Sequence, residues 1–336
     1  MSQGLAIPKR KWYQSQRALS LLEKLLSNSL LAATVVVIII YAILGRDMNY
    51  FTFENLVNIL LSLTTLGFLT WSMSVAMLAG NIDWSTAGIA AIASLTVGVL
   101  FMQKGVEAIP AILITLVVCM AFSLISSFLI VNLKIPALVA TIAVNGSFIA
   151  SAMFISNNTT INIRLPGLAD TLVNFNILHI PFIVWLMFLF FGIAYVMLNH
   201  TRLGAHIYAT GANPAAARLN GVKVSNVIRI TLMWSAVCVG MAGIIMTVRG
   251  GITQLYGSQI TITPAFTPVM LGGISIFGGR GRLENMLVAI IFITVLNNGL
   301  YMMNAQIGVV TLANGLVLLI ALVMSSLRDY IAKLKA

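Results

Sequence analysis

The stretch IPAILITLVVCMAFSLISSFLIVN, residues 109–132, decides the fold class of this chain. It contains no charged side chain and consists mostly of apolar residues. A membrane-spanning helix needs about 20 consecutive, mostly apolar residues, and this stretch is long enough. Its cysteine, Cys119, has no metal-ligand spacing to other residues and fits a small core position. The stretch therefore predicts a transmembrane helix.

The composition of the whole chain extends this prediction. Of 336 residues, 60% are hydrophobic and 8% are charged, and the mean hydropathy is +1.01. A soluble protein carries about a quarter charged residues to keep its surface in water. We therefore expect an all-α, polytopic membrane helix bundle, the alternative being a very oily soluble domain.

About ten apolar runs are long enough, or nearly long enough, to span a bilayer. They cover residues 27–45, 55–79, 87–103, 109–132, 136–157, 178–199, 225–248, 263–279, 284–304 and 309–327. The eighth run, TPAFTPVMLGGISIFGG, contains Pro264, Pro268 and four glycines. Such a run predicts a broken or tilted helix, which a membrane tolerates where protein or a water-filled cavity covers the backbone.

The basic residues predict the orientation. The net charge is +11, but the basic side chains lie in short segments between apolar runs, which favours membrane topology over nucleic-acid binding. With both termini cytoplasmic, the cytoplasmic side holds all lysines and arginines except Arg46, Lys104, Arg164 and Arg249. The expected organisation is a cytoplasmic segment (1–28), a transmembrane domain (29–327, with a cytoplasmic loop at about 200–225) and a cytoplasmic tail (328–336).

Motifs for catalysis or cofactor binding are missing from the sequence. It contains no G-x-x-x-x-G-K-[ST] loop for ATP, no H-E-x-x-H, no G-x-S-x-G and no paired-carboxylate motif. The interiors of the expected spans are nearly free of ionisable residues, which argues against proton coupling, although sodium sites can use carbonyls and hydroxyls. We therefore expect no enzyme activity, no cofactor and no metal site.

Two glycine-containing junctions interrupt the apolar pattern. In MLAGNIDWSTAG (77–88), Gly80, Asp83 and Ser85 predict a helix end, a turn fixed by Asp83 and a new helix capped by Ser or Thr. This junction fits either a discontinuous element that lines a path or an ordinary tight turn. In LGGISIFGGRGRLEN (271–285), Gly272 and Gly273 fit close helix packing and a tight cytoplasmic turn better than dinucleotide binding.

The stretch TGANPAAARLNGVKV, residues 210–224, predicts a short helix with both ends capped. Asn213 suits the N-cap, Pro214 the first helical position and Gly221 the left-handed C-terminal cap. About two turns are too few for a helix that is stable alone in water. Such a helix therefore needs a packing partner.

Amide side chains inside the expected spans are the remaining polar feature. Asn145, Asn297 and Asn298 lie in the fifth and ninth runs. An amide in hydrocarbon needs a hydrogen-bond partner, so these side chains are expected to face the bundle interior. Bonds between helices explain them, and so does contact with the hydroxyl groups of a neutral solute on a translocation path.

Taken together, these segments resemble the permease subunits of bacterial sugar-type ABC importers, the ribose, xylose, arabinose and autoinducer-2 class. Four motifs occur in the family's order across about residues 30–327: GNIDWSTAG (80–88), PALVATI (136–142), LGAHIYATGANPAAARLNGVKV (203–224), and GGISIFGGRG (272–281) followed by NGL (298–300). The chain departs from the family pattern at Asn81, at Trp84, at Ala205-His206 and at Glu284-Asn285. These departures leave the identity of the sugar open.

The resemblance implies a bacterial inner-membrane permease that works with an ABC ATPase subunit, a periplasmic solute-binding protein and a second permease chain, the same or different. ATP would bind the partner subunit, and the cargo would be a monosaccharide or a related polyol or furanosyl compound. Coupling to the ATPase would fall to Asn213, Pro214, Ala215, Ala216, Ala217, Arg218 and Gly221. Gating would fall to the helix breaks at Gly80, Asp83, Ser85, Gly272 and Gly273. An ion-coupled transporter or a channel for a small polar solute is the alternative.

Overall fold

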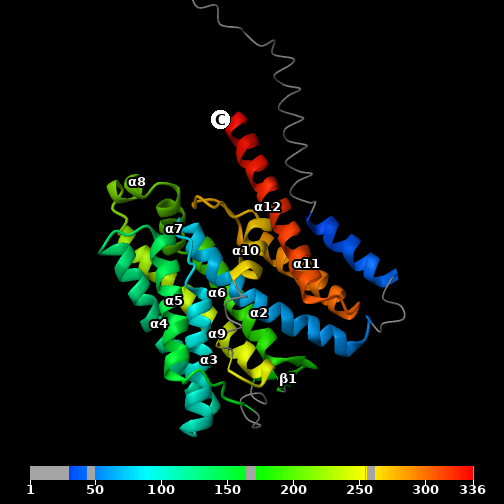
Figure 1. The fold of residues 1–336 in the computed structure, drawn as a ribbon. Coiled ribbons are helices and arrows are strands. Elements are labelled where there is room, and N and C mark those ends of the chain that lie inside the picture. Colours follow the sequence, from blue (N-terminus) through cyan, green and yellow to red (C-terminus); the bar gives the residue numbers. More distant parts are fainter. Residues whose placement is uncertain are drawn as a thin grey trace, which may run out of the picture.

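The computed structural model describes residues 30–43, 50–163, 172–173, 175–253, 255 and 262–335. Most of this part of the chain is helical, and the helices form a bundle (Figure 1). The all-α expectation is confirmed. The expected N-terminal segment, 1–28, lies outside the described residues.

Seven helices of the described part are long and apolar enough to cross a membrane. Each corresponds to one of the predicted runs, with ends that differ by a few residues. They are α2 (Phe53–Leu78), α3 (Thr86–Gly98) with its π-helical continuation η2 (Val99–Gln103), α4 (Ala108–Val131), α5 (Ala137–Ile155), α6 (Phe182–His200), α9 (Val224–Gly250) and α11 (Leu283–Met302).

The other three predicted runs form shorter or mixed elements. Apolar helices occupy Leu30–Ile43 and the start of α12 (Ile307–Lys335). The eighth run is broken, as its prolines and glycines predicted: α10 covers only Ile262–Leu271, and turns follow it. The prediction was wrong at the start of the sixth run, where residues 178–181 belong to a hairpin of β1 (Asn176–Ile177) and β2 (Ile180–Pro181).

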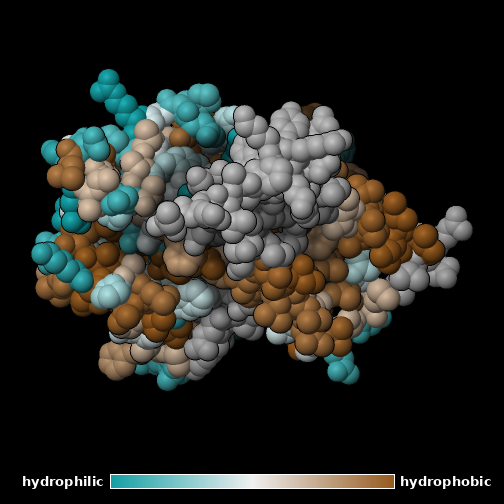
Figure 2. All heavy atoms as spheres, turned by 90° about the horizontal axis from the view of Figure 1, so that it is seen from above, coloured by the Kyte–Doolittle hydropathy of each residue, from teal (hydrophilic) through white to brown (hydrophobic). Residues whose placement is uncertain are grey.

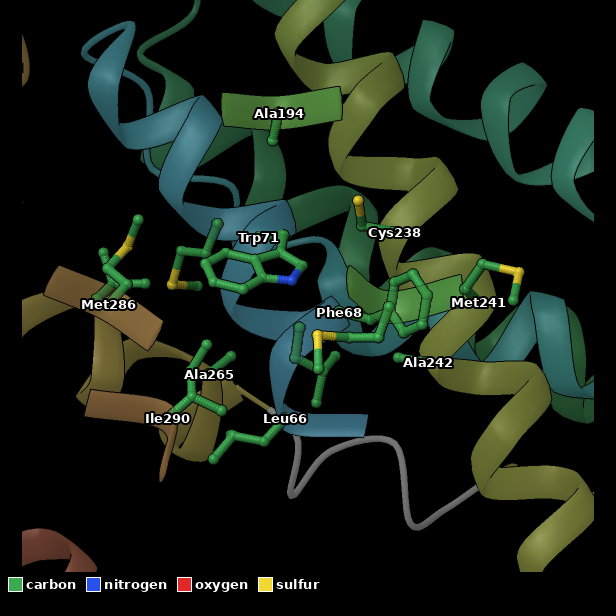
Figure 3. Close-up of a cluster of buried hydrophobic side chains, with 14 of the residues drawn as sticks. Leu66, Phe68, Trp71, Ala194, Cys238, Met241, Ala242, Ala265, Met286 and Ile290 are labelled. Carbon is green, nitrogen blue, oxygen red and sulfur yellow. The ribbon is translucent and has the colours of Figure 1, made fainter. Parts of the chain in front are cut away.

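The helices α2 and α9 form the centre of the bundle. Within the most apolar 18-residue stretch of each helix, 78% of the residues are buried in α2 and 72% in α9, against 22% in α4. Side chains of α2 fill the space between its neighbours: Trp71 and Phe68 lie between the α9 residues Cys238 and Met241 on one side and Met286 of α11 on the other (Figure 3). α2 therefore packs against α9, α10 and α11 at the same time.

Small residues allow α3 and α9 to pack closely. A Cβ atom added at Gly243 of α9 would lie 2.7 Å from the carbonyl oxygen of Ala90. The neighbouring hydroxyls of Ser94 and Thr247 share a hydrogen bond across the same interface. Membrane helices associate through such small-residue contacts because lipid provides no hydrophobic drive between them.

The outward surfaces of the peripheral helices are apolar. Large hydrophobic side chains are exposed on α4, α5, α6 and α12, including Leu113, Val139, Leu189 and Leu312. Figure 2 shows the molecule of Figure 1 from above. Hydrophobic residues cover large parts of its outer surface, and hydrophilic residues gather in separate clusters at the edge. Exposed apolar surface of this extent requires lipid rather than water.

Two short helices project from one end of the bundle. They are α7 (Arg202–Ala212) and α8 (Pro214–Leu219), and the last turns of α12 point to the same end, away from the β1–β2 hairpin (Figure 1). We call this side of the molecule the α8 end.

Candidate functional site

The short helix α8 has the predicted caps. The Asn213 Oδ1 accepts hydrogen bonds from the amides of Ala215 and Ala216, each at 3.0 Å, and Pro214 occupies the first turn. After the helix, Gly221 adopts a φ of +80°, a left-handed conformation that glycine reaches without strain. Its amide donates to the Arg218 carbonyl at 3.0 Å. The local prediction from sequence is confirmed.

α8 buries very little of its own surface. Only Ala217 is buried, whereas Ala215, Ala216 and Arg218 are exposed, and Leu219 is 90% exposed. A short helix with both ends fixed and most side chains in solvent is a rigid projection. Such a projection suits docking into the groove of another protein.

The stem helix α7 joins α8 to the bundle through a contact of three backbone segments. We call it the glycine junction; its members are Gly80 after α2, Gly211 in α7, and Gly278 and Gly279 in the α10–α11 loop. A Cβ atom at Gly211 would collide with the Leu78 carbonyl and the Gly279 amide, and one at Gly278 would lie 2.6 Å from the Gly80 Cα. Only glycine permits these backbones to approach so closely.

Two hydrogen bonds add to the glycine junction. The Gly279 amide donates to the Leu78 carbonyl at 2.9 Å, which joins the α10–α11 loop to the end of α2. The Tyr208 hydroxyl of α7 donates to the Gly281 carbonyl at 3.1 Å. Burial raises the pKa of Tyr208, with a further increase from nearby Glu284 and a decrease from Arg282. The hydroxyl therefore stays protonated, as this bond requires.

The break between α2 and α3 is built around a buried carboxylate. Asp83 is 1% exposed; its Oδ1 accepts from the Ser85 amide at 3.0 Å and from the Ser85 hydroxyl at 2.6 Å. Its Oδ2 accepts from the hydroxyl of Ser235, in α9, at 2.6 Å. The predicted role of Asp83 in fixing the turn is confirmed. The prediction that a Ser or Thr side chain caps α3 was wrong, because the Ser85 hydroxyl donates to Asp83 instead.

The second break ends α10 against α11. The Gly272 amide donates to the Pro268 carbonyl at 2.8 Å, and Gly273 has a φ of +81°. A Cβ atom at Gly272 would lie 2.5 Å from the Met286 side chain. The two breaks approach each other through an aromatic contact, because the Trp84 and Phe266 rings are 5.9 Å apart.

The three amides singled out from the sequence, Asn145, Asn297 and Asn298, differ in their bonding. The Asn145 Oδ1 accepts from the Gly88 amide at 2.7 Å, which joins α5 to the start of α3. Asn298 and Asn55 exchange two hydrogen bonds, at 2.9 and 3.2 Å, between α11 and α2. The Asn297 Oδ1 is buried and has no partner among the described residues. Asn145 and Asn298 thus make bonds between helices, whereas no described residue donates to the Asn297 Oδ1.

Sequence reasoning missed Gly211 and Ser235. Gly211 lies within the stretch 210–224, but nothing there shows that it contacts Leu78 and Gly279, and no local signal marks Ser235 as a donor to Asp83. Among the described residues, no three His, Cys, Asp or Glu side chains group as metal ligands.

Comparisons with known proteins agree with these features. The model of the family described as branched-chain amino acid transport system / permease component matches residues 55–327. The ribose import permease protein RbsC of Escherichia coli K12 is 29% identical over 302 residues, which cover 89% of this chain and 93% of the relative. The Bacillus subtilis protein of the same name is 29% identical over 276 residues, covering 80% and 84%.

A second kind of relative has another named cargo. The autoinducer 2 import system permease protein LsrC of Photorhabdus luminescens is 28% identical over 320 residues, covering 94% of this chain and 96% of the relative. No solved structure matches the chain.

Proposed function

Because the chain belongs to the family of branched-chain amino acid transport system permease components, we propose that it imports a monosaccharide or a related polyol or furanosyl compound. It is a multi-pass permease of the bacterial inner membrane and a subunit of a sugar-type ABC importer. The relatives named for ribose and autoinducer 2 favour a sugar-like cargo over an amino acid. An ion-coupled transporter is not favoured.

The exposed, rigid helix α8 is the observation that carries the coupling proposal. The sequence lacks an ATP-binding loop, so energy has to arrive from an ATPase subunit. In our proposal the ATPase receives α8 through Asn213, Pro214, Ala215, Ala216, Ala217, Arg218 and Gly221. The permease itself is non-catalytic and holds no cofactor, ATP being bound by the partner. A periplasmic solute-binding protein and a second permease chain complete the importer.

The glycine junction supports a route by which ATPase movement reaches the membrane helices. Gly211 lies in the stem of α8 and contacts both the end of α2 and the α10–α11 loop. A displacement of α8 would therefore move the two helix breaks together. Each nucleotide state of the ATPase must bind one conformation of the permease more tightly, since only differential affinity shifts a conformational equilibrium.

The breaks themselves are the proposed gates. Gly80, Asp83 and Ser85 form one, and Gly272 and Gly273 form the other. Trp84 and Phe266 connect them. The Asn297 Oδ1 has no hydrogen-bond partner among the described residues, which supports a place for Asn297 on the path. Asn145 and Asn298 would shape the path through the helices they join.

The proposed topology has about ten spans, with both termini in the cytoplasm. The common placement of α8 and the end of α12 supports this orientation (Figure 1). Residues 1–28 would then be a cytoplasmic segment, 29–327 the permease domain with the coupling loop at about 200–225, and 328–336 a cytoplasmic tail.

An uptake assay tests the proposed function. The permease is expressed with its ATPase and solute-binding protein, and uptake of labelled ribose is measured with excess unlabelled leucine as competitor. We expect uptake that requires ATP, survives a protonophore and is insensitive to leucine. Uptake that needs no ATPase and follows a proton or sodium gradient would contradict the proposal.

A further inference from the structure

We propose that Phe277, at the tip of the α10–α11 loop, is a second docking residue for the ATPase subunit, beside α8. This inference rests on the proposed function and adds an interface residue outside the coupling loop. The Phe277 side chain is 84% exposed, although the adjacent Gly278 is buried and Ser275 is 8% exposed. The loop thus presents one large apolar side chain from a packed base.

The backbone of the loop is held rigidly. The Ser275 amide donates to the Arg280 carbonyl at 3.0 Å, and the Gly278 amide donates to the Ser275 carbonyl at 3.1 Å. The Phe277 amide donates to the Ser275 Oγ at 3.3 Å. A side chain on a pre-ordered loop loses less conformational entropy on binding than one on a flexible loop. Such rigidity fits a docking residue.

The position of Phe277 is continuous with α8. Gly278 approaches Gly80 and Gly211, and a Cβ atom at Gly279 would lie 2.5 Å from the Ala212 amide nitrogen. α8 begins two residues after Ala212. Leu219 is the last residue of α8, and its side chain is exposed. Because the loop of Phe277 contacts the chain just before α8, Phe277 and Leu219 belong to one end of the molecule.

The neighbours of Phe277 favour a protein partner over lipid acyl chains. Arg280 and Arg282 follow it and are exposed, and Arg218 is exposed on α8. Charged side chains of this density are unfavourable against hydrocarbon. An apolar pocket with an acidic rim on the ATPase would match Phe277 in shape and the arginines in charge.

Thiol protection tests the assignment directly. Three single variants of the full permease are made: Phe277→Cys, Leu219→Cys and Phe154→Cys. The native cysteines need no removal, because Cys119 and Cys238 are completely buried. A membrane-impermeant maleimide then labels the solubilised permease with and without its ATPase. Phe154 is the matched control: it is also 84% exposed but lies near the far end of α5, away from α8.

We expect the ATPase to slow labelling of Phe277→Cys and Leu219→Cys by roughly tenfold or more, the protection given by the buried centre of an interface, and to leave Phe154→Cys unchanged. Protection of Leu219→Cys alone would overturn the assignment of Phe277 and leave the proposed function intact. Protection of neither would contradict both. Failure of Phe277→Cys to react even without ATPase would place the side chain inside the detergent micelle and also overturn the assignment.

A truncation provides a second measurement. Phe277→Ala should weaken ATPase binding by roughly tenfold, a typical loss for an aromatic docking residue, while Phe277→Trp should retain it. Unchanged binding in Phe277→Ala, with binding lost in the α8 variant Ala216→Glu, would contradict the proposal.

Discussion

The Gly279 amide donates a hydrogen bond to the Leu78 carbonyl at 2.9 Å, and Gly211 packs directly against both groups. The end of α2, the stem of α8 and the α10–α11 loop therefore meet without intervening side chains. Backbone contacts of this kind cannot slide or repack without breaking, so the three segments are expected to move as a unit.

Substitution of Gly211 should break that unit. Gly211→Val places a side chain where the Leu78 carbonyl and Gly279 amide lie, and overpacking of this kind costs about 1–3 kcal/mol. We expect a lower thermal transition in detergent and ATP hydrolysis that no longer drives uptake. Gly192→Val is the matched control, since a Cβ atom there has open space. Equal thermal stability and uptake in both variants would refute the role of the junction.

Asp83 and Ser235 should behave as a coupled pair. Ser235→Ala removes the donor to a buried carboxylate, and loss of a hydrogen bond to a charged group costs about 1.5–3 kcal/mol. Asp83→Ala should cost at least as much and impair gating or assembly, because it leaves two serine hydroxyls without their acceptor. The double variant should lose less stability than the sum of the single variants. Strict additivity, measured by thermal unfolding, would show that the two residues do not interact.

Alanine substitutions of the adjacent Asn297 and Asn298 should affect stability and uptake in opposite ways. Asn298→Ala breaks the reciprocal bonds with Asn55 and should lower stability by about 1 kcal/mol. Asn297→Ala removes an acceptor that makes no bond among the described residues, so it should leave stability nearly unchanged and raise the KM of uptake. An unchanged KM in Asn297→Ala would remove this residue from the path.

The contribution of Tyr208 to stability should depend on pH. Tyr208→Phe removes the bond to the Gly281 carbonyl and should cost about 0.5–1.5 kcal/mol at neutral pH. The pKa of Tyr208 is raised above 10.0 in the folded protein, so its contribution is fully present below the unfolded pKa and is lost as pH rises through the folded pKa. The stability difference between wild type and Tyr208→Phe should therefore stay constant to about pH 9 and shrink above pH 10. A difference that already shrinks between pH 6 and 8 would contradict this account.

Local patterns predicted much of the fold. Apolar runs located the long helices because a span of about 20 residues is a local property of sequence. The caps of α8 were likewise predictable, since Asn213, Pro214 and Gly221 bond to or shape only backbone that lies a few residues away in sequence. In the eighth run the break lies at Gly272 and Gly273, directly after α10, whereas Pro264 and Pro268 lie within that helix.

The site was only partly predictable, because its central contacts join distant segments. Asp83 and Ser235 are 152 positions apart, and no local pattern marks Ser235 as a donor. The glycine junction depends on Gly80, Gly211 and Gly279 meeting in space, and a glycine inside a helix has no sequence signal that identifies its neighbour. The start of the sixth span was misread because apolar residues such as Leu178 and Ile180 suit a hairpin as well as a helix.

The most direct test of the central claim, that α8 couples the permease to an ATPase, is ATP-driven uptake by Ala216→Glu. Ala216 is exposed, so a glutamate there should leave insertion and thermal stability unchanged while obstructing a docking groove. Gly221→Pro should act similarly because proline cannot adopt the φ of +80°. The conservative variant Ala216→Ser should transport normally. We expect Ala216→Glu to retain less than about a tenth of wild-type uptake and ATPase binding, the effect of disrupting an interface centre. Wild-type uptake by correctly inserted Ala216→Glu would contradict the account.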